Sequence, residues 1–194
     1  MKNKYIDLIE QTFEFPQEEF EVVDNELYFH KVPLMDIIKQ YGTPLKISYL
    51  PKISSQIQRA KILFNVAMAK VDYKGDYHYC YCTKSSHFSF VLEEALKNDI
   101  HIETSSAFDI NIIEDLAERG LFDKERYIIC NGFKRPMYIE NIMNLVNNGF
   151  TNVILVLDNL FELEKFESEL QHKIKIGIRI ASEEEPKFDF YTSR

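Results

Sequence analysis

Residues 79–98, YCYCTKSSHFSFVLEEALKN, join an alternating run of tyrosine and cysteine to a segment with helical periodicity. Successive side chains of a strand point to opposite faces, so Cys80, Cys82 and Lys84 share one face of the predicted strand. Lys84 then stands where the strand ends and the helix begins. A lysine in this place is either a loop residue whose ammonium reaches water, or a desolvated amine kept for covalent chemistry.

The same unit recurs along the chain: a short apolar run, a polar turn, and a segment whose apolar residues lie on one helical stripe. The pattern predicts strands over residues 79–83, 100–104, 127–131, 153–157 and 174–180, and helices over residues 87–98, 107–119, 136–148 and 160–171. Strands that alternate with amphipathic helices form parallel sheets, and parallel strands are apolar on both faces because both are buried. The fold is therefore α/β, either a doubly wound sheet or a (β/α) barrel.

Polar residues follow the predicted strands. In both architectures ligands bind at the carboxyl ends of the strands. The residues at or near those ends are Lys84, Glu103, Asn131, Asp158 and Arg179. Their common placement predicts a functional site at that edge of the sheet.

Several helix ends carry residues with known end preferences. They are Gly120 and Gly149 as left-handed caps, Pro136 in a first turn, and the pairs Ser106 with Asp109 and Asn159 with Glu162 as N-terminal caps.

Residues 1–50 are predicted to form an N-terminal segment that leads into the barrel, and residues 51–194 to form part of the barrel. Asp24 and Asn25 tolerate a positive φ and predict a hairpin. A short helix should stop at Gly42, and a strand should follow Pro44. The next helix should begin near Ser55, with Gln58 completing a capping box. Its apolar residues recur at helical spacing: Ile57, Ala60, Phe64, Ala67 and Met68.

Composition excludes several classes of protein. The 194 residues suffice for one domain with its core, and the net charge of -8 argues against a general nucleic-acid binder. No apolar run reaches the roughly 18 residues that span a membrane, and the N-terminus lacks the pattern of a signal peptide. Three cysteines outside any disulfide pattern indicate a reducing, cytoplasmic setting.

Five segments together resemble one enzyme family. YCTKSS, residues 81–86, looks like the Tyr-Ala-Val-Lys-Ala-Asn motif of the fold-type III pyridoxal-phosphate decarboxylases, which act on ornithine, arginine or diaminopimelate and are related to alanine racemase. YGTPLKISY (41–49) and IHIETSSAFDI (100–110) resemble further motifs of that family. YIICNGFKRPMYI (127–139) and IGIRIASEE (176–184) are most similar to bacterial arginine decarboxylases. The resemblance covers residues 27–194.

The resemblance implies an alanine-racemase-like (β/α)8 barrel, truncated here to about five units because no further helix or strand pattern follows the fifth strand. It implies that Lys84 forms the internal aldimine with pyridoxal 5'-phosphate, and that Glu103 and Arg179 lie in the cofactor pocket. It implies decarboxylation of a basic amino acid, arginine to agmatine in polyamine biosynthesis, by a protein that is a homodimer at full length. The phosphate site and the partner of the pyridine nitrogen are expected outside this chain, which we expect to be a fragment.

Alternatives stay open at several positions. Asp109 matches the second acid of its motif but is equally explained as a helix cap, and His87 is either an acid–base group or the start of a helix. Asn131 and Lys134 match a loop that either forms a turn or contacts a ligand, and Ser86 stands where the family often has asparagine.

The cysteines lack the spacing of a zinc site, so buried thiols are favoured over a metal centre. Diaminopimelate, ornithine or a carboxyspermidine-type compound are alternative substrates. A non-catalytic relative that binds a partner, or an unrelated flavodoxin-like or sugar-phosphate barrel, are the competing hypotheses.

Overall fold

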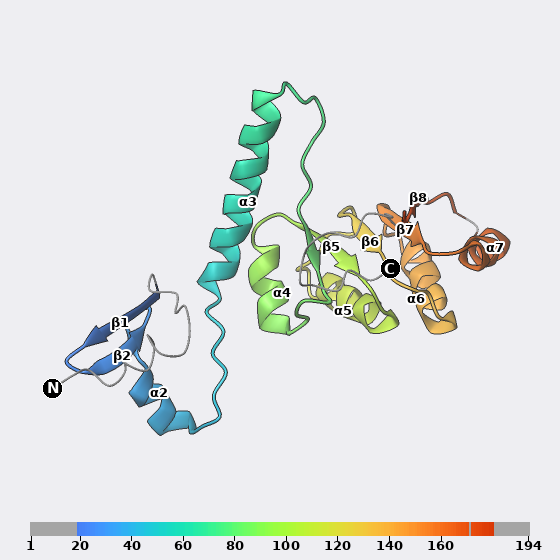
Figure 1. Ribbon diagram of the computed structural model, residues 1–194. Coiled ribbons are helices and arrows are strands. Elements are labelled where there is room, and N and C mark those ends of the chain that lie inside the picture. The colour runs from blue at the N-terminus through green and yellow to red at the C-terminus, as the bar shows by residue number, and fades with distance from the viewer. Residues whose placement is uncertain (1–18, 171, 181–194) are drawn as a thin grey trace. The chain divides into compact units, whose positions relative to one another are not determined.

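The computed structural model describes residues 19–170 and 172–180 (Figure 1). The chain falls into two compact units that meet at Ser48 and Tyr49. The predictions for the extreme N-terminus and for residues 181–194 lie outside the described residues. The functional division into a 1–50 segment and a 51–194 barrel part stays a prediction.

The first unit is a small antiparallel sheet followed by a helix. Strands β1 (Phe20–Val23) and β2 (Glu26–Phe29) pair around Asp24 and Asn25, whose φ angles are 48° and 66°. These values are those of the hairpin turn that the sequence predicts. Strand β3 (Val32–Pro33) pairs with β2, and helix α2 (Leu34–Tyr41) ends at Gly42, whose N–H donates to the Ile38 carbonyl. The predicted hairpin and helix stop are confirmed.

The strand predicted after Pro44 is wrong. Residues 44–49 have no regular structure, and Leu45, Ile47 and Tyr49 are 38%, 42% and 38% exposed. An extended segment becomes a strand only when a neighbour satisfies its backbone N–H and C=O groups. Within the described part of the chain, no strand pairs with this segment.

Helix α3 (Pro51–Lys70) opens the second unit and begins one turn earlier than predicted. Proline at its first turn has no N–H to leave unsatisfied, and its fixed φ favours the helix. Leu50 is the N-cap residue, and Ser55 lies inside the helix, where its hydroxyl donates to the Lys52 carbonyl. The Ser55–Gln58 capping box is therefore wrong.

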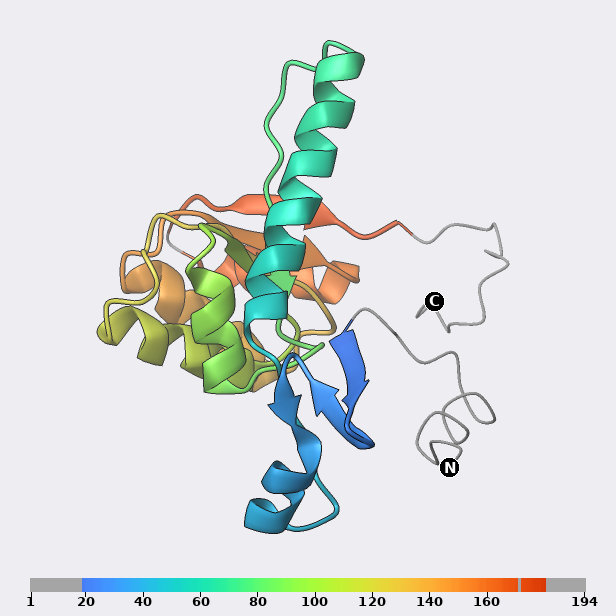
Figure 2. The same cartoon turned by 90° about the vertical axis from the view of Figure 1, so that its left-hand side faces the viewer.

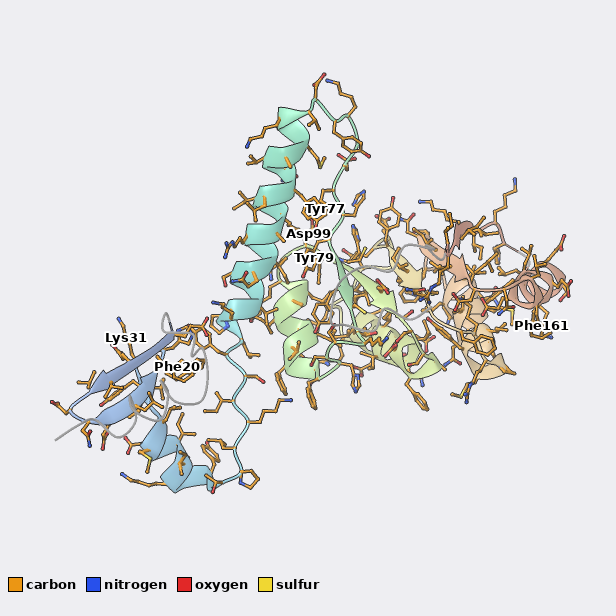
Figure 3. The ribbon with its side chains drawn as sticks, viewed as in Figure 1. Phe20, Lys31, Tyr77, Tyr79, Asp99 and Phe161 are labelled. Atoms are coloured by element: carbon orange, nitrogen blue, oxygen red, sulfur yellow. The ribbon has the colours of Figure 1, made fainter. Side chains whose placement is uncertain are left out.

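Only the first half of α3 is packed. Hydrogen bonds connect it to Asn98, which lies just after α4. Gln58 Nε2 donates to Asn98 Oδ1 at 3.0 Å, and Lys61 Nζ donates to the Asn98 carbonyl at 2.6 Å. Ile57 is the one buried residue of α3, whereas Phe64 on the same helix is 51% exposed. Phe64 stacks on Tyr77 with ring centroids 4.2 Å apart. Figure 3 shows Tyr77 on the segment that leads from α3 to β4.

The second unit is built on a five-stranded parallel sheet whose strands follow the chain in order (Figure 1). They are β4 (Cys80–Cys82), β5 (His101–Thr104), β6 (Ile128–Cys130), β7 (Val153–Leu157) and β8 (Lys175–Ile178). Between them lie α4 (Ser89–Leu96), α5 (Ala107–Glu118), α6 (Pro136–Asn147) and α7 (Leu160–Glu169). All five predicted strands and all four predicted helices are confirmed, with ends that shift by a few residues.

One face of this sheet carries the core. Alternate strand residues such as Ile102, Ile128 and Leu155 are fully buried, while their neighbours in the strands are only half-buried. Figure 2 shows α4, α5 and α6 gathered on one side of the sheet, which explains the alternation. In β5 to β7 the strand residues of the other face, Glu103 among them, are only half-buried.

The local signals at the helix ends are also confirmed. Ser106 and Asn159 accept hydrogen bonds from the backbone N–H groups of Asp109 and Glu162, and Pro136 lies in the first turn of α6. Within residues 19–170 and 172–180, no helix is both long and apolar enough to cross a bilayer.

Candidate functional site

The five polar residues predicted to share one edge of the sheet do so. In the parallel registers each of them lies at or just beyond the carboxyl end of its strand: Lys84, Glu103, Asn131, Asp158 and Arg179. Four of their side chains form two contacting groups, Glu103 with Asn131 on β5 and β6, and Asp158 with Arg179 on β7 and β8.

Glu103 is the centre of the first group. It is half-buried on the face away from the helices, because its neighbours Ile102 and Thr104 point into the core. Asn131 Nδ2 donates to Glu103 Oε1 at 2.9 Å, and the Cys82 thiol lies 4.0 Å from the same oxygen. The sequence prediction that Glu103 belongs to the site is compatible with this geometry, whereas no sequence pattern indicated its contact with Asn131.

Asp158 and Arg179 form the second group. Arg179 Nη1 lies 3.6 Å from Asp158 Oδ1, with side chains 38% and 16% exposed. Asp158 Oδ1 is buried, and among the described residues it has no hydrogen-bond partner. The pair therefore places a guanidinium next to a buried carboxylate oxygen that makes no hydrogen bond within the described residues.

Lys84 follows β4 directly, as predicted, but its side chain is exposed. Within the described part of the chain, its ammonium makes no hydrogen bond or ion pair. Of the two alternatives that the sequence left open, the described residues show the exposed lysine, and none of them covers its side chain. The amine is free to react with a ligand that reaches this edge.

A fully buried ion pair lies behind the edge. Lys134 and Glu162 are each 0% exposed, and Nζ lies 3.2 Å from Oε2. Lys134 Nζ also donates to the carbonyls of Gly132 and Val156, and Glu162 accepts from the backbone N–H groups of Lys134 and Asp158. Lys134 therefore anchors the loop after β6. The sequence showed Lys134 as a lysine in a polar turn, but its acidic partner lies in the next β/α repeat, on α7.

Two other candidates, Asp109 and His87, lie near the starts of α5 and α4. The Asp109 carboxylate accepts from the Ser105 N–H at 2.8 Å and is buried at the start of α5, so its role is that of a cap. His87 is exposed and precedes α4 by two residues.

The three thiols are free and cannot converge. Cys130 is buried on the helix side, where burial raises the pKa of its thiol to about 12. Cys80 and Cys82 lie on the opposite face and are only half-buried, less than expected. Burial raises the pKa of the Cys80 thiol, and the nearby Glu103 carboxylate raises it further.

The edge partly fits pyridoxal phosphate. Lys84 supplies a free primary amine for an aldehyde, Glu103 a carboxylate, and Arg179 a guanidinium. The buried Asp158 oxygen without a hydrogen bond is what a site leaves open for a polar ligand.

No protein-family model matches the chain. Among curated proteins it is similar to biosynthetic arginine decarboxylases. It is 25% identical over 136 residues to the one from Parasynechococcus marenigrum, 23% over 150 residues to the one from Bacteroides thetaiotaomicron, and 29% over 135 residues to the one from Trichlorobacter lovleyi. These alignments cover 66%, 74% and 66% of this chain but 20%, 23% and 20% of the relatives, so the chain spans about a fifth of their length.

Solved structures show the same fold. The chain superposes on the biosynthetic arginine decarboxylase of Campylobacter jejuni with a TM-score of 0.62 and 22% identity, covering 92% of this chain and 30% of that one. It superposes on the diaminopimelate decarboxylase of M. jannaschi with a TM-score of 0.68 and 17% identity, covering 88% and 37%. The resemblance expected from the motifs is thereby confirmed: the chain is similar in sequence to biosynthetic arginine decarboxylases, and its fold is that of the alanine-racemase-like barrel decarboxylases.

Proposed function

We propose that this chain is the lysine-bearing part of a pyridoxal-phosphate-dependent decarboxylase that converts arginine to agmatine, a precursor of polyamines. The observation that carries the proposal is the free Lys84 amine at the same strand edge as the Glu103–Asn131 and Asp158–Arg179 groups. The sequence similarity to arginine decarboxylases supports the choice of arginine, and the fold supports the reaction class.

Each residue has a distinct role in this proposal. Lys84 holds the cofactor covalently through its ε-amine, and Glu103 and Arg179 bind its polar atoms. Asp158, through its contact with Arg179, sets the direction of that guanidinium. When bound, pyridoxal phosphate supplies an electron sink for the electron pair that the departing carboxylate leaves behind.

The reaction is a proton-for-carboxylate exchange. The bond between the α carbon and the carboxylate breaks, carbon dioxide leaves, and a proton takes its place on the α carbon. The product amine carries one carboxylate fewer than the substrate, so the net charge of arginine rises by one. Residues that hold the substrate carboxylate away from water would favour this step, because the charged carboxylate loses its stabilising hydration shell while the carbon dioxide that leaves is neutral.

The test uses the full-length protein that contains residues 1–194. The protein is incubated with pyridoxal phosphate, reduced with borohydride and mapped by mass spectrometry, and carbon dioxide release is measured from arginine. We expect the adduct on Lys84 and release from arginine, both lost in Lys84→Ala. Lys97→Ala is the matched control, because Lys97 is an exposed lysine whose partner is Glu94 on α4.

The outcomes separate the alternatives. Release from ornithine, diaminopimelate or a carboxyspermidine-type compound in place of arginine would change the substrate and keep the reaction. An adduct that persists in Lys84→Ala would overturn the role of Lys84. A protein that forms no adduct and releases no carbon dioxide would be a non-catalytic relative.

Two further parts of the proposal concern the setting. The free thiols of Cys80, Cys82 and Cys130 support a reducing, cytoplasmic compartment. The family resemblance supports a homodimer for the full-length protein, which light scattering after size-exclusion chromatography measures directly.

A further inference from the structure

We propose that Asn131 is a positioning residue, which fixes the Glu103 carboxylate so that Oε1 is held by the protein and Oε2 is presented to the ligand. The inference rests on the proposed function, in which Glu103 contacts the cofactor. Asn131 itself contacts neither cofactor nor substrate in this account.

The two oxygens of Glu103 have different surroundings. Oε1 accepts from Asn131 Nδ2 at 2.9 Å and lies 4.0 Å from the Cys82 thiol. Oε2 has no hydrogen-bond partner within residues 19–170 and 172–180. A carboxylate held in this way at one oxygen has its other oxygen left to accept from a ligand.

The direction of the Asn131 amide follows from a second hydrogen bond. Its Oδ1 accepts from the Gly132 N–H at 2.8 Å, so the NH2 group must be the end that faces Glu103. The Asn131 backbone is held on both sides: its N–H donates to the Thr104 carbonyl at 2.9 Å, and its carbonyl accepts from the Tyr138 hydroxyl at 3.2 Å. The amide is therefore fixed relative to strand β5, which carries Glu103.

The buried ion pair keeps this loop in place. Lys134 Nζ donates to the Gly132 carbonyl at 2.7 Å and pairs with Glu162 at the start of α7. Since both charges are fully desolvated, the loop cannot shift without breaking a contact that is costly to lose. Asn131 therefore meets Glu103 as part of a rigid frame, which is the arrangement that accurate sites require.

The test compares two isosteric substitutions in the full-length protein. Asn131→Asp keeps an oxygen for the Gly132 N–H but replaces the donor to Glu103 by a second carboxylate. Asn141→Asp is the matched control: Asn141 Nδ2 donates to the Ala107 carbonyl and to Asn111 Oδ1, both at 3.0 Å, between α5 and α6. The readouts are the dissociation constant of pyridoxal phosphate, the absorbance maximum of the bound cofactor, and kcat and KM separately.

We expect Asn131→Asp to weaken cofactor binding by about tenfold or more and to shift the absorbance maximum, because a hydrogen bond to a charged group is worth at least that factor. In a Glu103→Ala background the same substitution should change binding by less than about twofold, since a residue that acts through Glu103 has nothing left to act on. Asn141→Asp should lower the melting temperature without moving the absorbance maximum.

Equal losses from Asn131→Asp in the wild-type and Glu103→Ala backgrounds would overturn the proposal while the Lys84 adduct stays intact. The proposal also fails if Asn131→Asp behaves like Asn141→Asp. Loss of the Lys84 adduct from the unmodified protein would instead overturn the proposed function, and the role of Glu103 with it. If Asn131→Asp does not fold, Asn131→Ala in the same cycle decides, because it removes the donor without adding a charge.

Discussion

Lys134 and Glu162 form an ion pair from which solvent is excluded, with both side chains 0% exposed and Nζ 3.2 Å from Oε2. The pair joins the loop after β6 to the start of α7, and its remaining hydrogen-bonding atoms reach backbone groups of Gly132, Val156 and Asp158. A buried charge of this kind is tolerated only while its partner is present.

Lys134→Met should destabilise the protein by about 3–5 kcal/mol, because the Glu162 carboxylate is then left buried without a counter-charge. Urea denaturation followed by circular dichroism measures the loss. The double substitution Lys134→Met and Glu162→Gln should recover part of it, since neither charge remains.

An exposed pair of the same residue types provides the control. Lys165 pairs with Glu169 one turn later on α7, with side chains 43% and 36% exposed. Lys165→Met should cost about 0.5 kcal/mol or less, as exposed helical pairs do. Similar losses from Lys134→Met and Lys165→Met would show that burial of the first pair does not govern stability.

The same pair shows where prediction from sequence stops. The β/α units, the caps at Ser106 and Asn159 and the polar edge were all predictable, because each depends on periodicity or on residues within one turn of each other. Lys134 and Glu162 are 28 residues apart and belong to different β/α repeats of the sheet, so no local sequence pattern joins them. Which polar loop residue becomes an anchor is decided by the packing of neighbouring units.

The sequence left the exposure of Lys84 open, and it did not predict the exposure of the second half of α3, for a related reason. Strand alternation and helical periodicity say which residues share a face, but not whether anything covers that face. Phe64 stays 51% exposed although it stacks on Tyr77, and Lys84 is exposed as well, while the pattern of both segments is that of buried elements.

Acid should weaken the amino-terminal edge of the sheet. His101 Nδ1 accepts from the Tyr127 N–H at 3.1 Å, so its proton lies on Nε2, which faces His78 Nδ1 at 3.1 Å. Burial lowers the pKa of His101, and His78 and Arg126 lower it further. Lys61 acts in the same direction, and Asp99 opposes them.

The sign follows from the two states. In the unfolded chain His101 takes up a proton near pH 6.5, whereas in the folded protein it does so only at a lower pH. The contribution of His101 to stability is therefore full above about pH 6.5 and declines as the pH falls from there toward the pKa of the folded state. His101→Gln should flatten this decline in urea denaturation series between pH 7 and pH 5. His87→Gln, at an exposed histidine, should leave it as in the wild type. An unchanged slope in His101→Gln would assign the acid sensitivity to other groups.

Glu103 should protect the thiol of Cys80 from alkylation. Thiolates react and thiols do not, and after burial the Glu103 carboxylate is the second cause of the raised pKa of Cys80. Glu103→Gln should therefore increase the rate of Cys80 carbamidomethylation at pH 8, measured by peptide mapping over time. Glu93→Gln, which removes a carboxylate paired with Arg119 at 2.5 Å, should not change that rate. Equal rates in all three proteins would mean that Glu103 is not charged beside Cys80.

Gly132→Ala should disturb the candidate site more than a matched glycine substitution elsewhere. Gly132 and Gly120 have similar positive φ values, 76° and 70°, which cost any other residue about 1–2 kcal/mol. A Cβ at Gly120 meets nothing within 4 Å, whereas one at Gly132 lies 3.1 Å from the Ser105 carbonyl. We expect Gly120→Ala to show the backbone cost alone, and Gly132→Ala a further loss of about 1–3 kcal/mol in urea denaturation. Because the Gly132 N–H holds the Asn131 amide, Gly132→Ala should also weaken pyridoxal phosphate binding. Equal losses of stability in Gly132→Ala and Gly120→Ala would contradict the close approach of Gly132 to Ser105.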